Sequence, residues 1–405
     1  MKLKSLLLLL ISLLYINNLE IIGKNLILKD DETTLDGARL PVGGISYFNQ
    51  VLTISESGTY ILSGTLNGQI SVSVQDKIVI VLNGITINSN SNGIIFLNAP
   101  EIDQNNSLNP NSFSVNLDNV GAKLIVADGS ENTINGGKSA EFDGAVHSCV
   151  SLLIGGETKG DGVLNVIGSS EGIETDMHLF FNGGIIKVVG NDDAINANLE
   201  NKSIVYVKSG KLFLNGGLGQ EGDGIDSNGY IIIDGGELVI SAKAGMDSGL
   251  DSDHTIINGG IVMAVGSALD YASDKCTQPT MNLVFKANVE VYNNLSIKDS
   301  NGNEIISYCA NTANFVSGSQ RKTYFAAIIS HPNFKNGSTY HIFIDGVHYG
   351  YTGNKAGFDW GQGFPWGPGG NNPWGQQGGD EDAEIKTDFT LGNSATSFSG
   401  VQKVS

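Results

Sequence analysis

A repeat rich in Asp, Asn and Gly between residues 140 and 265 constrains the fold more than any other feature of this chain. Its clearest copies read EGIETD (171–176), DDAINAN (192–198), GDGIDSN (222–228) and SGLDSD (248–253), and a weaker copy reads DGAVHSC (143–149). The central apolar residues are Val146, Ile173, Ile195, Ile225 and Leu250, which are 27, 22, 30 and 25 residues apart. Repeats of about 20 to 30 residues are typical of a solenoid.

Short strand patterns that end in paired glycines lie between the copies. Examples are LFFNGG (179–184), IIIDGG (231–236) and TIINGG (255–260), and another apolar run follows each glycine pair. No helical period is sustained, the leucine spacing of a horseshoe is missing, and a propeller blade of about 40 residues is too long for this repeat. The sequence therefore predicts an all-β protein, a right-handed parallel β-helix over residues 30–280. Residues 281–352 are expected to form a C-terminal β cap over its last edge.

The two ends of the chain have their own composition. Lys2 and Lys4 precede an apolar run from Leu6 to Ile16, which has the length of a signal peptide and is too short for a membrane span. We therefore expect residues 1–22 to be a signal peptide and the protein to be secreted or held at the cell surface. An uncleaved anchor is the alternative, and no other membrane segment is expected.

Residues 353–384 are a low-complexity segment rich in Gly and Trp, and residues 385–405 form a C-terminal tail. The tryptophans of the segment are Trp360, Trp366 and Trp374. Such a segment is either a flexible linker or an aromatic strip that stacks on sugar rings.

The charge balance excludes some partners. The chain has 42 acidic and 23 basic residues, a net charge of −19, and its arginines are Arg39 and Arg321. Nucleic acids and anionic membranes are recognised by basic surfaces, so neither is an expected partner. We expect a monomer.

Export would permit disulfides and glycans. Cys276 and Cys309 lie outside the repeats and are candidates for a disulfide, whereas Cys149 lies in a strand pattern and is expected to be a buried thiol. The glycosylation sequons are at Asn105, Asn201, Asn294 and Asn336.

The polar residues of the repeat point to calcium. Residues alternate in direction along a strand, and equivalent positions of successive turns stack about 4.8 Å apart, so the polar residues flanking the central apolar positions should form one column. Its candidate cation ligands are Glu171, Glu174, Asp176, Asp192, Asp193, Asn196, Asp223, Asp226, Asn228, Asp247, Asp251 and Asp253. With Glu221 the column gathers eleven acids, and the four strong copies contain no Lys, Arg or His.

Stacked like charges destabilise a sheet, and calcium, which takes six to eight oxygen ligands, would neutralise them. The alternative is a purely structural ladder of good turn residues. Zinc is disfavoured, because the cysteines and histidines do not cluster in the sequence.

The motifs GDGIDSNGYIIIDGGELVIS (222–241), NDDAINAN (191–198) and GLDSDHTIINGG (249–260) resemble a known family. It comprises secreted carbohydrate-binding β-helix proteins that bind calcium and polygalacturonate and are related in fold to pectate lyases. Asp192, Asp193 and Asn196 are also similar to the calcium-site motif of one pectate lyase family, in which the last position is Asp. The resemblance implies calcium-dependent binding of an acidic plant cell-wall polysaccharide such as pectate.

Binding without catalysis is the preferred interpretation, and a calcium-dependent lyase or a structural, adhesive surface protein are the alternatives. A lyase needs Arg or Lys as the base near the sugar, yet no arginine lies between Arg39 and Arg321. We assign no catalytic residue. Besides the tryptophans, Lys187 and Lys208 are the candidate contacts to carbohydrate.

Overall fold

The computed structural model describes residues 23–97, 117–118, 120–219, 222–242, 247–266, 270–310, 323–353 and 383–404. Apart from the three-residue 3-10 helix η1 (Asp30–Glu32), the regular elements of this part are β-strands. None of its helices is long and apolar enough to span a membrane. The predicted signal peptide, Asn105, Glu221 and the three tryptophans lie outside these residues.

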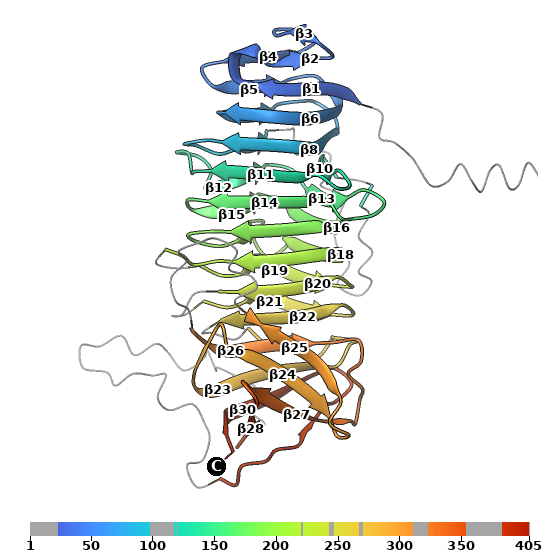
Figure 1. Cartoon of the computed structure of the whole chain (residues 1–405), viewed down its shortest axis with the longest axis vertical. Helices are drawn as coiled ribbons and strands as arrows, with labels where there is room; N and C mark the ends of the chain where they lie inside the picture. Colours follow the sequence, from blue (N-terminus) through green and yellow to red (C-terminus); the bar gives the residue numbers. More distant parts are fainter. Residues whose placement is uncertain are drawn as a thin grey trace, which may run out of the picture.

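The first of three parallel ladders that run along the long axis of the molecule carries the acidic repeat (Figure 1). Its strands are β5 (Val51–Ile54), β7 (Gln69–Val72), β9 (Ile94–Phe96), β12 (Gly144–Ser148), β15 (Glu171–Thr175), β17 (Ile195–Ala197), and the first residues of β19 (Ile225–Ile233) and β21 (Leu250–Ile257). The central apolar residues pair in the order Val146, Ile173, Ile195, Ile225 and Leu250. This register is the one that aligning the sequence copies predicts.

The other two ladders share long strands that turn a corner. The shared strands are β6 (Gly58–Asn67), β8 (Ile78–Asn88), β16 (His178–Val189) and β18 (Ile204–Asn215). Their first halves form the second ladder with β1 (Lys24–Lys29), β10 (Ala122–Val126), β13 (Leu152–Gly156) and the second halves of β19 and β21, in which β21 pairs with β19. Their second halves form the third ladder with β11 (Glu131–Gly136), β14 (Val163–Gly168), β20 (Glu237–Ser241) and β22 (Ile261–Gly266), in which β22 pairs with β20.

Glycine makes these corners possible. Gly183 and Gly184 have φ of +94° and +78°, and Gly210 has φ of +107°, a region that residues with a Cβ rarely adopt. A Cβ on Gly210 would lie 2.9 Å from the carbonyl oxygen of Gly183 on the neighbouring strand. The paired glycines that seem to end a strand in the sequence therefore lie inside one continuous strand at Gly183 and Gly184. The pairs Gly235–Gly236 and Gly259–Gly260 lie between β19 and β20 and between β21 and β22.

The predicted right-handed parallel β-helix solenoid is wrong as a description of this fold, and so is the fold implied by the family resemblance. The strands form a closed parallel barrel with extra strands, and all of them are linked in one 30-stranded sheet. The sequence divides each repeat into separate short strands, whereas β16 and β18 each span 12 residues and belong to two ladders. Continuity through the glycine corners joins the ladders, and antiparallel strands are added at both ends.

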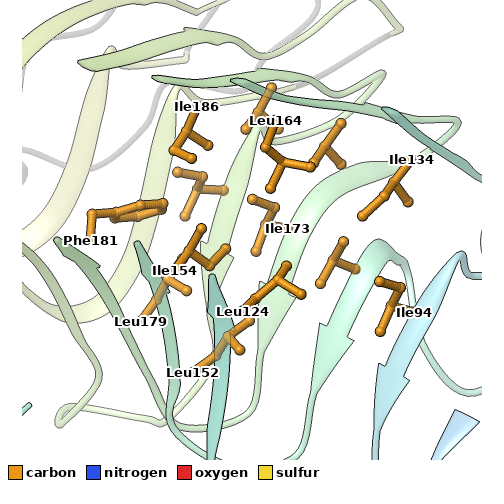
Figure 2. Close-up of a cluster of buried hydrophobic side chains, with 14 of the residues drawn as sticks. Ile94, Leu124, Ile134, Leu152, Ile154, Leu164, Ile173, Leu179, Phe181 and Ile186 are labelled. Carbon is orange, nitrogen blue, oxygen red and sulfur yellow. The ribbon is translucent and has the colours of Figure 1, made fainter. Parts of the chain in front are cut away.

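The apolar core fills the barrel. Side chains from the three ladders point toward one another in its interior, as Ile173, Leu152 and Leu164 illustrate (Figure 2). All three are fully buried, and alternate residues of each strand face inward, as the two-residue period of a strand requires. Packing of this core fixes the position of each ladder strand along the barrel, and the strands in turn position the polar side chains of the repeat.

Antiparallel strands cover both ends of the barrel. At the N-terminal end β1 pairs with β2 (Thr34–Leu35), which pairs with β3 (Ala38–Arg39), and β5 pairs with β4 (Ile45–Phe48). These pairs occupy backbone groups that an open sheet edge would expose.

At the C-terminal end β22 pairs with β26 (Thr323–Ser330), and a second apolar core forms there. The further strands of this end are β23 (Thr280–Glu290), β24 (Asn294–Asp299), β25 (Glu304–Cys309), β27 (Thr339–Ile344), β28 (Val347–Gly350), β29 (Phe389–Thr390) and β30 (Ala395–Lys403).

The predicted Cys276–Cys309 disulfide is not present. All three cysteines are free thiols, and Cys149 is partly exposed rather than buried. Cys276 lies in the barrel core and accepts the N–H of Ile257, whereas Cys309 donates to the carbonyl of Val291 at the C-terminal end. The two thiols therefore have separate partners. Among the sequons, Asn201, Asn294 and Asn336 are exposed.

Candidate cation and carbohydrate site

Four side chains of the repeat form what we call the acidic column. Glu174 on β15, Asn196 on β17, Asp226 on β19 and Asp251 on β21 are register partners, and His147 on β12 precedes them. Each residue follows the central apolar residue of its strand and lies outside the core. Glu174 and Asn196 are nevertheless only 7% and 9% exposed, so this part of the column is shielded from water more than an outward direction alone predicts.

A second set of acids lies at the start of these strands or just before them, and we call Glu171, Asp193 and Asp223 the inner carboxylates. Oδ1 of Asp193 accepts the backbone N–H of Asp223 at 2.6 Å, and Oδ1 of Asp223 accepts that of Ser248. Each of these two carboxylates thus bonds the backbone of the next turn. This role is structural and is part of the alternative that the sequence left open.

Burial and mutual repulsion raise the pKa values of these carboxyls. Burial, followed by the charge of Glu174, raises the pKa of Glu171 to about 9. Burial raises the pKa of Asp193 to about 8, and burial with the nearby Asp251 raises that of Asp223 to about 9. Asp226 and Asp251 have pKa values raised to about 6 and about 7, again mainly by burial.

No Lys or Arg forms an ion pair with Asp226, Asp251 or any inner carboxylate within the described residues. Without a cation, the folded state therefore keeps this group of carboxyls near neutral pH only if several of them are protonated.

Two buried oxygen atoms of this site have no hydrogen-bond partner among the described residues: Oε2 of Glu171 and Oδ1 of Asn196. Their side chains are joined by the bond from Nδ2 of Asn196 to Oε1 of Glu171, at 2.9 Å. Buried polar atoms almost always have a partner, so unpaired ones require an explanation such as water or an ion. Carboxylate and amide oxygens are ligands that calcium prefers, and they fit the predicted ion.

A compact group at the start of the acidic column was not predicted. Nδ1 of His147 lies 2.8 Å from Oε2 of Glu174, and its Nε2 lies 3.5 Å from Sγ of Cys149 and 3.6 Å from Oδ2 of Asp176. Burial opposes a charge on His147, but hydrogen bonds to Asp176, Cys149 and Glu174 raise its pKa to about 11. Burial likewise opposes ionisation of Glu174 and Asp176, yet their bonds to His147 lower both pKa values.

His147, Cys149 and Asp176 are the one set of three or more His, Cys, Asp or Glu residues in the described part of the chain whose ligand atoms lie within 4.8 Å of one another. The sequence analysis disfavoured zinc because cysteines and histidines do not cluster, and for His147 and Cys149 this premise is wrong. The aligned copies contained the signal, because they place Asp176 opposite Cys149 and Glu174 opposite His147. Conversely, no three carboxylates of the acidic column are that close, so calcium there would need amide, backbone or external oxygens.

The remaining predicted ligands occupy different surroundings. Asp253 is exposed, Asp192 and Asp247 are partly buried, and Nδ2 of Asn228 donates to the carbonyl of Asn198. Asp270, which the repeat pattern did not reveal, accepts from Oγ of Ser248 at 3.2 Å and adds to the raised pKa of Asp251. It lies beyond the last repeat copy, where no copy could be aligned to it.

The predicted lysines lie away from the acidic column. Lys187 is partly buried in the second half of β16, and Lys208 is exposed in β18. Near that corner the paired glycines line a groove of about 560 Å³, which also contains Lys159, Lys211 and Glu237. Nζ of Lys211 lies 2.9 Å from Oε2 of Glu237. The sequence did not predict this groove.

The barrel thus carries two candidate ligand surfaces, the acidic column and the glycine-lined groove. Residues 49–313 match the profile of the carbohydrate-binding domain-containing proteins, and the chain belongs to this family. Among solved structures, a polysaccharide lyase-like protein from C. thermocellum, in a gadolinium derivative, is similar at 22% identity and a TM-score of 0.40, over 59% of this chain and 92% of that one. No curated protein matches the sequence.

Proposed function

We propose that this carbohydrate-binding protein recognises an acidic polysaccharide such as polygalacturonate through calcium held at the acidic column, without cleaving it. The supporting observation is the stack of Asn196, Asp226 and Asp251 beside the inner carboxylates. Several of these carboxyls have raised pKa values, and none is paired with Lys or Arg within the described residues. A divalent cation replaces the protons that they otherwise need.

The sparse arrangement of carboxylates favours a shared ion. Because no three of them converge, a calcium ion at the column keeps coordination positions for ligands from outside the protein. Uronate carboxylates can fill those positions. This also accounts for attraction between a polyanion and a protein of charge −19, which would otherwise repel each other.

The test is retention of the protein on immobilised polygalacturonate, with calcium and with EDTA, compared with a neutral glucan and with methyl-esterified pectin. We expect retention on polygalacturonate alone and only with calcium. The double variant Asp226→Asn/Asp251→Asn should weaken retention and calcium affinity about tenfold, as lost metal ligands do. Equal retention in EDTA would overturn the role of calcium.

Glu237→Gln is the matched control, because Glu237 lies in the glycine groove and not on the column. It should leave both affinities nearly unchanged. If Glu237→Gln abolished retention while the double variant did not, the polysaccharide site would be the groove instead. A gain of ultraviolet absorbance from unsaturated sugars, with pectate and calcium, would show a lyase and overturn the non-catalytic assignment.

A further inference from the structure

The group at the start of the acidic column has a composition unlike the rest of the column. His147 lies in β12, Cys149 directly follows this strand and contacts His147, and Asp176 follows β15 next to them. A nitrogen, a sulfur and an oxygen atom thus face one another. This donor set is suited to zinc or a similar transition-metal ion, whereas calcium takes oxygen ligands.

We propose that His147, Cys149 and Asp176 bind one zinc ion, distinct from the calcium proposed for the column. The ligand atoms would be Nε2, Sγ and Oδ2, with zinc between them and the fourth position left to water or another ligand. Three protein ligands and one open position are a common arrangement for zinc.

The distances fit without rearrangement of the backbone. Around a tetrahedral zinc ion, with bonds of about 2.3 Å to sulfur and about 2.0 Å to nitrogen or oxygen, donor atoms lie about 3.3–3.6 Å apart. The observed separations from Nε2 are 3.5 Å to Sγ and 3.6 Å to Oδ2. The three donors lie within 4.8 Å of one another, so only a small inward movement of Cys149 and Asp176 is needed.

The surroundings hold the imidazole in the orientation that a metal needs. Oε2 of Glu174 bonds Nδ1 of His147 and is itself fixed by the backbone N–H groups of Asp143 and Gly144, at 2.9 Å each. Phe142 stacks on the ring, with centroids 3.9 Å apart. A metal-bound histidine usually gives its other N–H to a carboxylate in this way, which leaves Nε2 for the ion. Glu174 is therefore a positioning residue.

Access is also suitable. The His147 side chain is fully buried, but the Asp176 side chain is 46% exposed and Cys149 is partly exposed. An ion can thus enter from the Asp176 side.

The test uses the reduced, full-length protein, stripped with a chelator and titrated with Co²⁺ as a spectroscopic substitute for zinc, in excess calcium. We expect one equivalent to bind and to give thiolate-to-cobalt charge-transfer absorption, which zinc then abolishes. Because calcium is in excess, the result does not depend on the polysaccharide-binding proposal. Absence of the one-equivalent thiolate band would overturn the site.

Variants locate the ion. Cys149→Ser should remove the charge-transfer band, and Asp176→Asn should weaken Co²⁺ binding at least about tenfold. Cys309→Ser, which changes another partly exposed cysteine, should leave the band unchanged. If Cys149→Ser fails to fold, alkylation of Cys149 in the wild-type protein decides: zinc should slow it at least about tenfold, and equal rates with and without zinc would contradict the proposal.

Discussion

His147 and Glu174 are register partners on adjacent parallel strands, and Nδ1 of the one lies 2.8 Å from Oε2 of the other. The pair begins the acidic column with the only basic group that contacts a column carboxylate within the described residues. Oε1 of Glu174 also accepts from Nδ2 of Asn198 at 3.0 Å, so this carboxylate is bonded on both oxygens. At β12 and β15 the column carboxylate is therefore paired with a histidine. At β19 and β21 the column carboxylates Asp226 and Asp251 have no basic partner among the described residues.

The change Glu174→Gln should reduce the free energy of unfolding by about 3 kcal/mol, because it leaves the buried His147 with Asp176, at 3.6 Å, as its one carboxylate partner among the described residues. Urea unfolding near neutral pH measures this. Glu141→Gln, at an exposed position, is the control and should change stability by less than about 0.5 kcal/mol. Equal stability of the two variants would contradict a structural role for the His147–Glu174 pair.

Stability in EDTA should fall as the pH rises from about 5 to about 8. Glu171, Asp193 and Asp223 have pKa values raised to about 9, 8 and 9, against an ordinary value of about 4. At a pH between the ordinary and the raised pKa values, the folded state binds protons that the unfolded state has lost. The contribution of these carboxyls to the free energy of unfolding is therefore complete below pH 4 and is lost as the pH rises through the raised pKa values.

We expect this pH change to cost on the order of 1–3 kcal/mol, and added calcium at pH 8 to restore the loss. Thermal unfolding with and without calcium measures both effects. A melting temperature in EDTA that is the same at pH 5 and pH 8 would show that the inner carboxylates do not hold these protons.

Two variants of Asp223 distinguish the effect of an inner carboxylate's ionisation on stability from the effect of its hydrogen bond. Asp223→Asn keeps an oxygen that can accept the N–H of Ser248 and cannot ionise, so the folded variant does not have to take up a proton that the unfolded chain has lost. In EDTA at pH 8 it should raise stability by about 1 kcal/mol. Asp223→Ala leaves that N–H unpaired and should lower stability by about 1–3 kcal/mol. Chemical denaturation of both variants tests this, and a shift of both in the same direction would refute it.

The glycine corners give a matched pair of variants. Gly64 and Gly84 both have positive φ, +97° and +80°, but a Cβ on Gly64 would lie 2.4 Å from the carbonyl oxygen of Leu28, whereas one on Gly84 meets nothing within 4 Å. Gly84→Ala should cost about 1 kcal/mol from backbone strain, and Gly64→Ala at least about 2 kcal/mol more, because β1 must move. Equal unfolding free energies would show that the close approach of β1 and β6 is not needed.

Much of the site could be predicted from the sequence because strand periodicity is local. The alternation around Ile173, Ile195 and Ile225 predicts which residues leave the core, and aligning the copies predicts the observed register. The overall fold could not be predicted in the same way. Paired glycines have the same letters where one strand turns a corner, as at Gly183 and Gly184, and where a strand ends, as at Gly235 and Gly236, and positive φ values occur in both cases.

The sequence by itself determined that the protein is all-β, that acids recur at 22 to 30 residues, and that Glu174, Asn196, Asp226 and Asp251 share one column. Only the tertiary structure decided what each acid does. Asp193 and Asp223 accept hydrogen bonds from the backbone of the following repeat, Glu174 forms an ion pair with His147, and Cys149 lies close to Asp176. The physical reason is that these contacts join neighbouring turns, and their geometry depends on how the turns stack, which periodicity along one strand does not specify.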